Sequence, residues 1–123
     1  MLKTIDEVFD AVYAREFVEL WNIHSKKAHA TAIEKGWWDK NRSDGECIAL
    51  MHSELSEALE SQRHGSPPDE HIPEFTGEEV ELGDAVIRIM DFGQAKGLRI
   101  AEAILAKMAF NQTRPHKHGG KAF

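Results

Sequence analysis

The sequence contains little cysteine and no long uninterrupted hydrophobic run. Cys47 is the single cysteine, so no internal disulfide can form and a reducing compartment is expected. No apolar run approaches the roughly 20 residues needed to cross a bilayer. The opening MLKTIDEVFD becomes charged too early to resemble a signal peptide. We therefore expect a cytoplasmic protein with no membrane partner.

An excess of basic residues is also absent. The formal net charge of -6 argues against a general nucleic-acid-binding protein, so no nucleic-acid partner is expected. The same charge suits a protein that gathers carboxylates around a metal ion. A chain of 123 residues fits a single domain, 1–123. Helical hairpins of this size often complete their core by oligomerising.

Four segments have the pattern of helices, and no segment has that of a strand. Each of the first three predicted helices begins with a Ser/Thr-x-x-Glu capping signal and ends at a glycine. The expected helices are 4–35, 43–64, 76–96 and 98–113. Prolines interrupt the segment between the second and third, and a basic tail from about 114 to 123 is expected to be flexible. The prediction is an all-α four-helix bundle.

Two pairs of acidic residues stand out on the second and third predicted helices. Glu54 and Glu57 are three residues apart, as are Glu81 and Asp84, so each pair projects from one helix face. Two antiparallel helices would bring the four carboxylates together, where they repel one another. A hard divalent cation resolves that repulsion, and Mg²⁺ is expected, with Mn²⁺ as an alternative.

A less specific interpretation competes with each pair. Glutamates three residues apart are common on solvated helix faces, and one pair alone indicates little. Two pairs on neighbouring helices, both beside apolar positions, favour a metal site. No zinc-type Cys/His spacing occurs and no Glu-x-x-His occurs, which disfavours zinc and a ferritin-like di-iron site.

The acidic pairs resemble a known signature. ELSE at 54–57 followed by ELGD at 81–84 is similar to the E-x-x-E and E-x-x-D motifs of the MazG-like, all-α nucleoside triphosphate pyrophosphohydrolases. The ending KMAFNQTRPHKHGGKAF, from Lys107, also resembles that family. The resemblance implies an oligomeric helical bundle that hydrolyses a (d)NTP to the (d)NMP and pyrophosphate with Mg²⁺.

The resemblance also implies roles for individual residues. Glu54, Glu57, Glu81 and Asp84 would hold the metal. Lys107 and Asn111 would face the phosphates. His29 and Trp38, nine residues apart, match the spacing of a base-binding pair in dCTP-type relatives, which leaves Trp37 to packing.

The expected mechanism needs an aligned water and compensation of the phosphate charge. Metal-activated water is the nucleophile, and Glu57 is the candidate base, so the catalytic set is Glu54, Glu57 and Lys107. Further cations could hold the triphosphate: Arg88, Arg114 and Lys117. Arg114 and Lys117 could equally complement the negative end of the last helix, and Lys107 could be an exposed cation.

Arg88 departs from the family pattern, since some relatives carry an aromatic or apolar residue there. It could bind phosphate, or it could neutralise the acidic cluster and displace a metal. The second outcome motivates an alternative function, a non-catalytic nucleotide-binding or helical interaction module. A purely structural bundle is a third hypothesis.

Overall fold

The computed structural model describes residues 4–117 and 122, and their secondary structure is helical. The helices are α1 (Ile5–Glu34), α2 (Asp44–Arg63), α3 (Gly77–Lys96) and α4 (Ile100–Gln112). Within this part of the chain there is no strand, only an isolated antiparallel bridge between Pro68 and Thr76. The all-α prediction is confirmed. Half of the basic tail, residues 118–121 and 123, lies outside the described residues, including His118 and Lys121.

The helix starts follow the capping residues closely. Thr4 caps α1 and Thr76 caps α3, each in a reciprocal capping box with the glutamate three residues later. Ser43 caps α2 by accepting a hydrogen bond from the backbone N–H of Glu46. Helix α4 has no such side-chain cap, and it begins two residues later than predicted. Side-chain capping therefore determines where the three helices that have such a cap begin.

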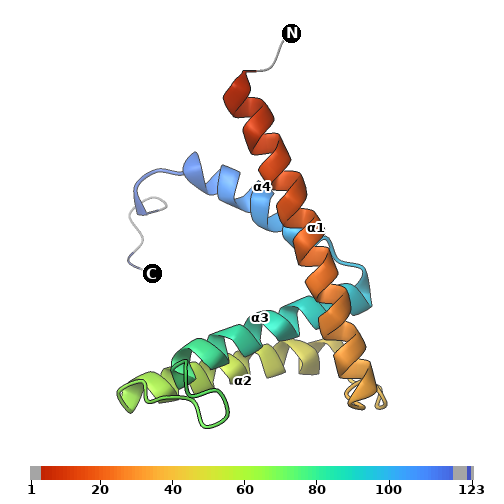
Figure 1. Cartoon of the computed structure of the whole chain (residues 1–123), viewed down its shortest axis with the longest axis vertical. Coiled ribbons are helices and arrows are strands. Elements are labelled where there is room, and N and C mark those ends of the chain that lie inside the picture. The colour runs from red at the N-terminus through yellow and green to blue at the C-terminus, as the bar shows by residue number, and fades with distance from the viewer. Residues whose placement is uncertain (1–3, 118–121, 123) are drawn as a thin grey trace.

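Helices α2 and α3 form an antiparallel hairpin, and α1 crosses α3 (Figure 1). These three helices make a helical bundle. Helix α4 turns away from the hairpin after Gly97, whose φ of 67° ends α3 in a left-handed cap. It contacts α1 over a short stretch and leaves the hairpin uncovered on that side. One chain therefore does not close all four helices around a common core.

The interior is built from small side chains. The buried hydrophobic residues are Cys47, Ala58, Ala85 and Ala101, and no large side chain in the described part is fully buried. Large apolar residues remain exposed on α1 and α4, such as Phe9 at 57% and Phe110 at 55%. The chain exposes 9677 Å², whereas a compact protein of 13.9 kDa exposes about 6,700 Å².

None of the described helices combines the length and the apolar character that a transmembrane segment requires.

Two glycines on α3 provide a matched test of how tightly the helices pack. A methyl group at Gly83 meets nothing within 4 Å, so Gly83→Ala should stabilise by about 0.5–1 kcal/mol through helix propensity. A methyl group at buried Gly93 would lie 2.9 Å from Ile100 Cγ1, so Gly93→Ala should destabilise by about 1 kcal/mol. Urea unfolding at one protein concentration measures both. Equal stabilisation by the two variants would contradict the packing described between α3 and α4.

Candidate metal and ligand site

Three carboxylates from α2 and α3 converge at the hairpin. Glu54, Glu57 and Glu81 each offer an oxygen, and these oxygens lie within 4.8 Å of one another. Glu54 is buried, Glu81 is half-buried and Glu57 is exposed, so the group opens toward solvent on one side. The antiparallel hairpin thus brings together three of the four carboxylates that the sequence singled out. The oxygens of Asp84 are not part of the group, although Asp84 lies one turn along α3.

Burial and the neighbouring carboxyls raise the pKa of two acidic side chains on α3, Glu81 and Asp84. Burial, followed by the neighbouring Glu54 and Glu57 carboxyls, raises the pKa of Glu81 from 4.5 to about 8. Burial and the negative charge of Glu54 also raise the pKa of Asp84, while Arg88 acts in the opposite direction. Without a cation, Glu81 therefore holds a proton at neutral pH.

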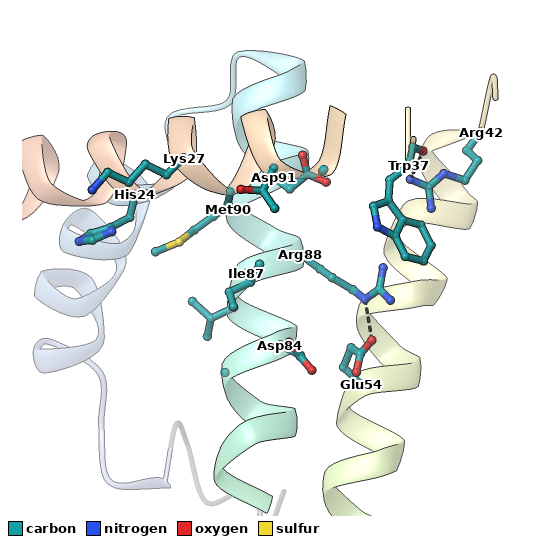
Figure 2. A pocket seen from close by; sticks show the side chains of 15 residues that line it. His24, Lys27, Trp37, Arg42, Glu54, Asp84, Ile87, Arg88, Met90 and Asp91 are labelled. Carbon is teal, nitrogen blue, oxygen red and sulfur yellow. Dashed lines mark hydrogen bonds and ion pairs between the residues drawn. The ribbon is translucent and has the colours of Figure 1, made fainter. Parts of the chain in front are cut away.

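Arg88 provides a positive charge inside this acidic group. Its Nε donates a hydrogen bond to Glu54 Oε1 at 2.7 Å, and both side chains are largely shielded from water (Figure 2). A buried carboxylate needs such a partner, because an unpaired charge in this environment is strongly unfavourable. Arg88 thus compensates Glu54, while Glu57 and Glu81 have no comparable cation among their described contacts.

The donor set suits a hard divalent cation. All three groups offer carboxylate oxygen, the ligand that Mg²⁺ and Mn²⁺ prefer. In addition, Glu81 Oε2 is buried and accepts no hydrogen bond from a donor group of the described protein. Its neighbours are the carboxyls of Glu54 and Glu57, with which Glu81 can pair only by sharing a proton. A cation can replace that proton, because it relieves the same repulsion. The residues present therefore fit a metal site of the Mg²⁺ type.

A cavity of about 840 Å³ runs along α3 and reaches the acidic group at Glu54. Helix α1, the loop between α1 and α2, and α3 supply most of its wall, and Figure 2 shows Trp37, Arg88 and Glu54 together on one side of α3. The lining residues that carry charge or an aromatic ring are His24, Lys27, Trp37, Arg42, Glu54, Asp84, Arg88 and Asp91. Its size lies within the range of cavities that bind small molecules.

His29 and Trp38 meet at a carboxylate instead of lining this cavity. His29 Nδ1 lies 2.7 Å from Asp91 Oδ1, and Trp38 Nε1 donates to both oxygens of Asp91 at 2.9 and 3.2 Å. Asp91 on α3 therefore ties the end of α1 to the loop that follows it. The sequence assigned Trp38 to the ligand and Trp37 to packing. In the structure Trp37 lines the cavity, whereas Trp38 does not.

The cations expected from the C-terminal part are not near the acidic group in the single chain. Lys107 and Asn111 are exposed on α4, which diverges from the hairpin (Figure 1). Lys107 and Arg114 lie over the ring of Phe110, at 4.7 and 5.8 Å from its centre. Lys117 is exposed as well. None of the four lines the cavity in the single chain.

Several polar residues of the cavity were not assigned a ligand-binding role from the sequence. Asp91 lies on the α3 face of Asp84 and Arg88, so helical spacing indicated its position. The α1 residues His24, Lys27 and Thr31 also recur at helical spacing on one face. Arg42 lies in a polar loop with no periodic pattern, and no sequence signal could identify it.

No family model, no curated protein and no solved structure matches this chain. What the site does therefore has to be inferred from its own geometry, together with the motifs that resemble the pyrophosphohydrolases.

The raised pKa of Glu81 predicts a pH dependence of stability. Between about pH 4.5 and 8, the unfolded chain releases a proton that the folded chain keeps, so ionisation favours unfolding. We therefore compare the free energy of unfolding of wild type with that of Glu81→Gln in the presence of a chelator. The value for wild type should fall relative to that of the variant as pH rises through this window. Adding Mg²⁺ should stabilise wild type more at pH 8 than at pH 5, because it favours the ionised carboxyl. Thermal unfolding across pH measures both effects.

Glu74, exposed in the loop between α2 and α3, supplies the control. Glu74→Gln should track wild type at every pH. Parallel curves for wild type and Glu81→Gln would show that Glu81 titrates normally in the folded protein.

Proposed function

We propose that the protein is a Mg²⁺-dependent nucleotide pyrophosphohydrolase, cleaving a (d)NTP to the (d)NMP and pyrophosphate. The observation that carries this proposal is the position of Glu54. It belongs both to the three-carboxylate group and to the wall of the 840 Å³ cavity, so a ligand in the cavity can reach a cation held by the group. The resemblance of ELSE and ELGD to the pyrophosphohydrolase motifs supports the same reaction class.

Each acidic side chain then has a distinct part. Glu54, Glu57 and Glu81 hold the cation, and Asp84, one turn from Glu81, adds negative charge beside them. When bound, such a cation offsets phosphate charge and lowers the pKa of water. Glu57 is the most exposed of the three, and we assign it to accept the proton of the attacking water.

Cations in the cavity wall are placed to bind the phosphates. Arg42 and Arg88 lie on the side of the cavity where Glu54 stands, and their guanidinium groups carry positive charge and N–H donors toward phosphate oxygens there. Arg88 is already bonded to Glu54, so phosphate binding and carboxylate pairing share one side chain. This shared use makes Arg88 the link between the metal side and the phosphate side of the site.

The same contact favours the alternative, a non-catalytic nucleotide-binding or interaction module. If Arg88 stays on Glu54, it satisfies that carboxylate without a metal. Nucleotide binding would then be independent of Mg²⁺ and would lead to no product. Calorimetry with and without Mg²⁺ distinguishes this module from the enzyme.

A substrate panel tests the catalytic proposal directly. Purified protein with Mg²⁺ should release pyrophosphate from at least one of the common NTPs or dNTPs. Glu57→Gln should lower kcat by about 10²–10⁴, the usual contribution of a general base, whereas Glu60→Gln, exposed one turn further along α2, should leave it unchanged. Absence of pyrophosphate from every nucleotide would refute the enzyme.

We also propose that the active form is a homodimer or homotetramer. The chain exposes about 3,000 Å² more than a compact protein of its mass, an excess in the range that obligate interfaces bury. The apolar residues of α1 and α4 supply suitable surface, for example Phe9, Tyr13 and Phe110. In an oligomer, Lys107 and Asn111 of one copy would lie near the acidic group of another copy, which they do not reach within a single chain.

Mixed oligomers test whether the site is shared. Solution mass measurement should show a multiple of 13.9 kDa. Glu57→Gln and Lys107→Met should each be nearly inactive, but co-expressed together in a dimer they should regain about a quarter of wild-type activity, because mixed dimers hold one intact site. No regain would place Lys107 in the same subunit as its carboxylates, and full activity of Lys107→Met would exclude it from the site.

A further inference from the structure

Trp37 and Trp38 are adjacent in the chain but differ in their surroundings. The indole N–H of Trp38 is committed to Asp91, and its ring meets the His29 ring edge-on, with centres 5.4 Å apart and planes at 77°. A ligand ring inserted between two aromatic groups needs parallel faces with space between them. These two rings are in contact and nearly perpendicular, so they form no such slot.

Trp37 differs from Trp38 in its exposure and in lining the cavity, although Arg42 also lies 5.7 Å from the centre of the Trp38 ring. The Trp37 side chain is 53% exposed and lines the cavity beside Arg88 and Glu54 (Figure 2). The guanidinium carbons of Arg42 and Arg88 each lie 5.8 Å from its ring centre, at the outer limit of a cation–π contact. The face of the indole is therefore framed by cations without being covered by a closely stacked side chain.

The backbone of Trp37 is held in place. Arg42 Nη2 donates to the backbone carbonyl oxygen of Trp37 at 2.6 Å. The contacts of Asp91 with His29 and Trp38 anchor the same loop to α3. An exposed aromatic side chain on an anchored loop is suited to stacking, because the loop loses little conformational freedom on binding.

We propose that Trp37, and not Trp38, is the platform on which the base of the nucleotide stacks, with Arg42 and Arg88 beside it. This inference rests on the proposed function, since it takes the cavity ligand to be a nucleotide whose phosphates face Glu54. His29, Trp38 and Asp91 then hold the loop that carries the platform and make no contact with the base. The site would bind ligands that combine a flat heteroaromatic ring with a polyanionic chain.

Calorimetry with α,β-methylene analogues of dCTP, dTTP, dATP and dGTP in Mg²⁺ tests the proposal, with inorganic tripolyphosphate as a base-free probe. Trp37→Ala should weaken binding of the preferred analogue by about tenfold to a hundredfold, the loss expected for one stacked base. Its affinity for tripolyphosphate should not change. Trp37→Phe should retain most of the affinity, and Trp21→Phe, a tryptophan on α1 that does not line the cavity, is the matched control.

Several outcomes would overturn the proposal. These are an unchanged analogue affinity in Trp37→Ala, an equal loss for tripolyphosphate, a larger loss in Trp38→Phe than in Trp37→Ala, or no binding of any analogue by wild type. The pyrophosphate assay separates this inference from catalysis. A protein that binds through Trp37 without releasing pyrophosphate would support the platform and refute the enzyme.

Discussion

The burial of Glu54 at the contact between α2 and α3 is the constraint on which the rest of the site depends. A carboxylate in that position has to be compensated, and the chain supplies Arg88 from α3 as its partner. Glu57 and Glu81 add further negative charge within 4.8 Å, and the structure accommodates it by raising the proton affinity of Glu81. A hairpin designed only for stability would place apolar side chains at these positions. A cation held by this group could relieve the repulsion in place of that proton.

Much of the fold follows from local chemistry that the sequence displays. Thr4, Ser43 and Thr76 mark helix starts because a hydroxyl beside free N–H groups is a strong and local signal. The meeting of Glu54 and Glu57 with Glu81 follows from i, i+3 spacing on two adjacent antiparallel helices. The course of α4 could not be predicted in this way, because it depends on which surfaces remain for it after α1 has packed on α3. Lys107 and Asn111 were expected beside the carboxylates and instead lie on the diverging helix.

The two tryptophans show why spacing alone does not assign a binding residue. His29 and Trp38 do come together, as their separation suggested, but what joins them is Asp91, which lies more than fifty residues further along the chain. That long-range hydrogen bond holds the indole of Trp38 against α3, while the indole of Trp37 lines the cavity. A single sequence gives no direct information about such a partner, whereas the helical face shared by Asp84, Arg88 and Asp91 gives an indirect indication.

The pairing of Arg88 with Glu54 also bears on how the proposed cation would bind. Any cation that binds Glu54 competes with a guanidinium tethered to the neighbouring helix, and a tether of this kind corresponds to a local concentration of roughly millimolar or above. This competition lowers the apparent affinity of every cation by the same factor, and it therefore excludes first the ions that bind most weakly. A polyanionic ligand, as proposed, can accept the released arginine and offset that loss. The internal ion pair would then couple occupancy of the acidic group to the arrival of its ligand.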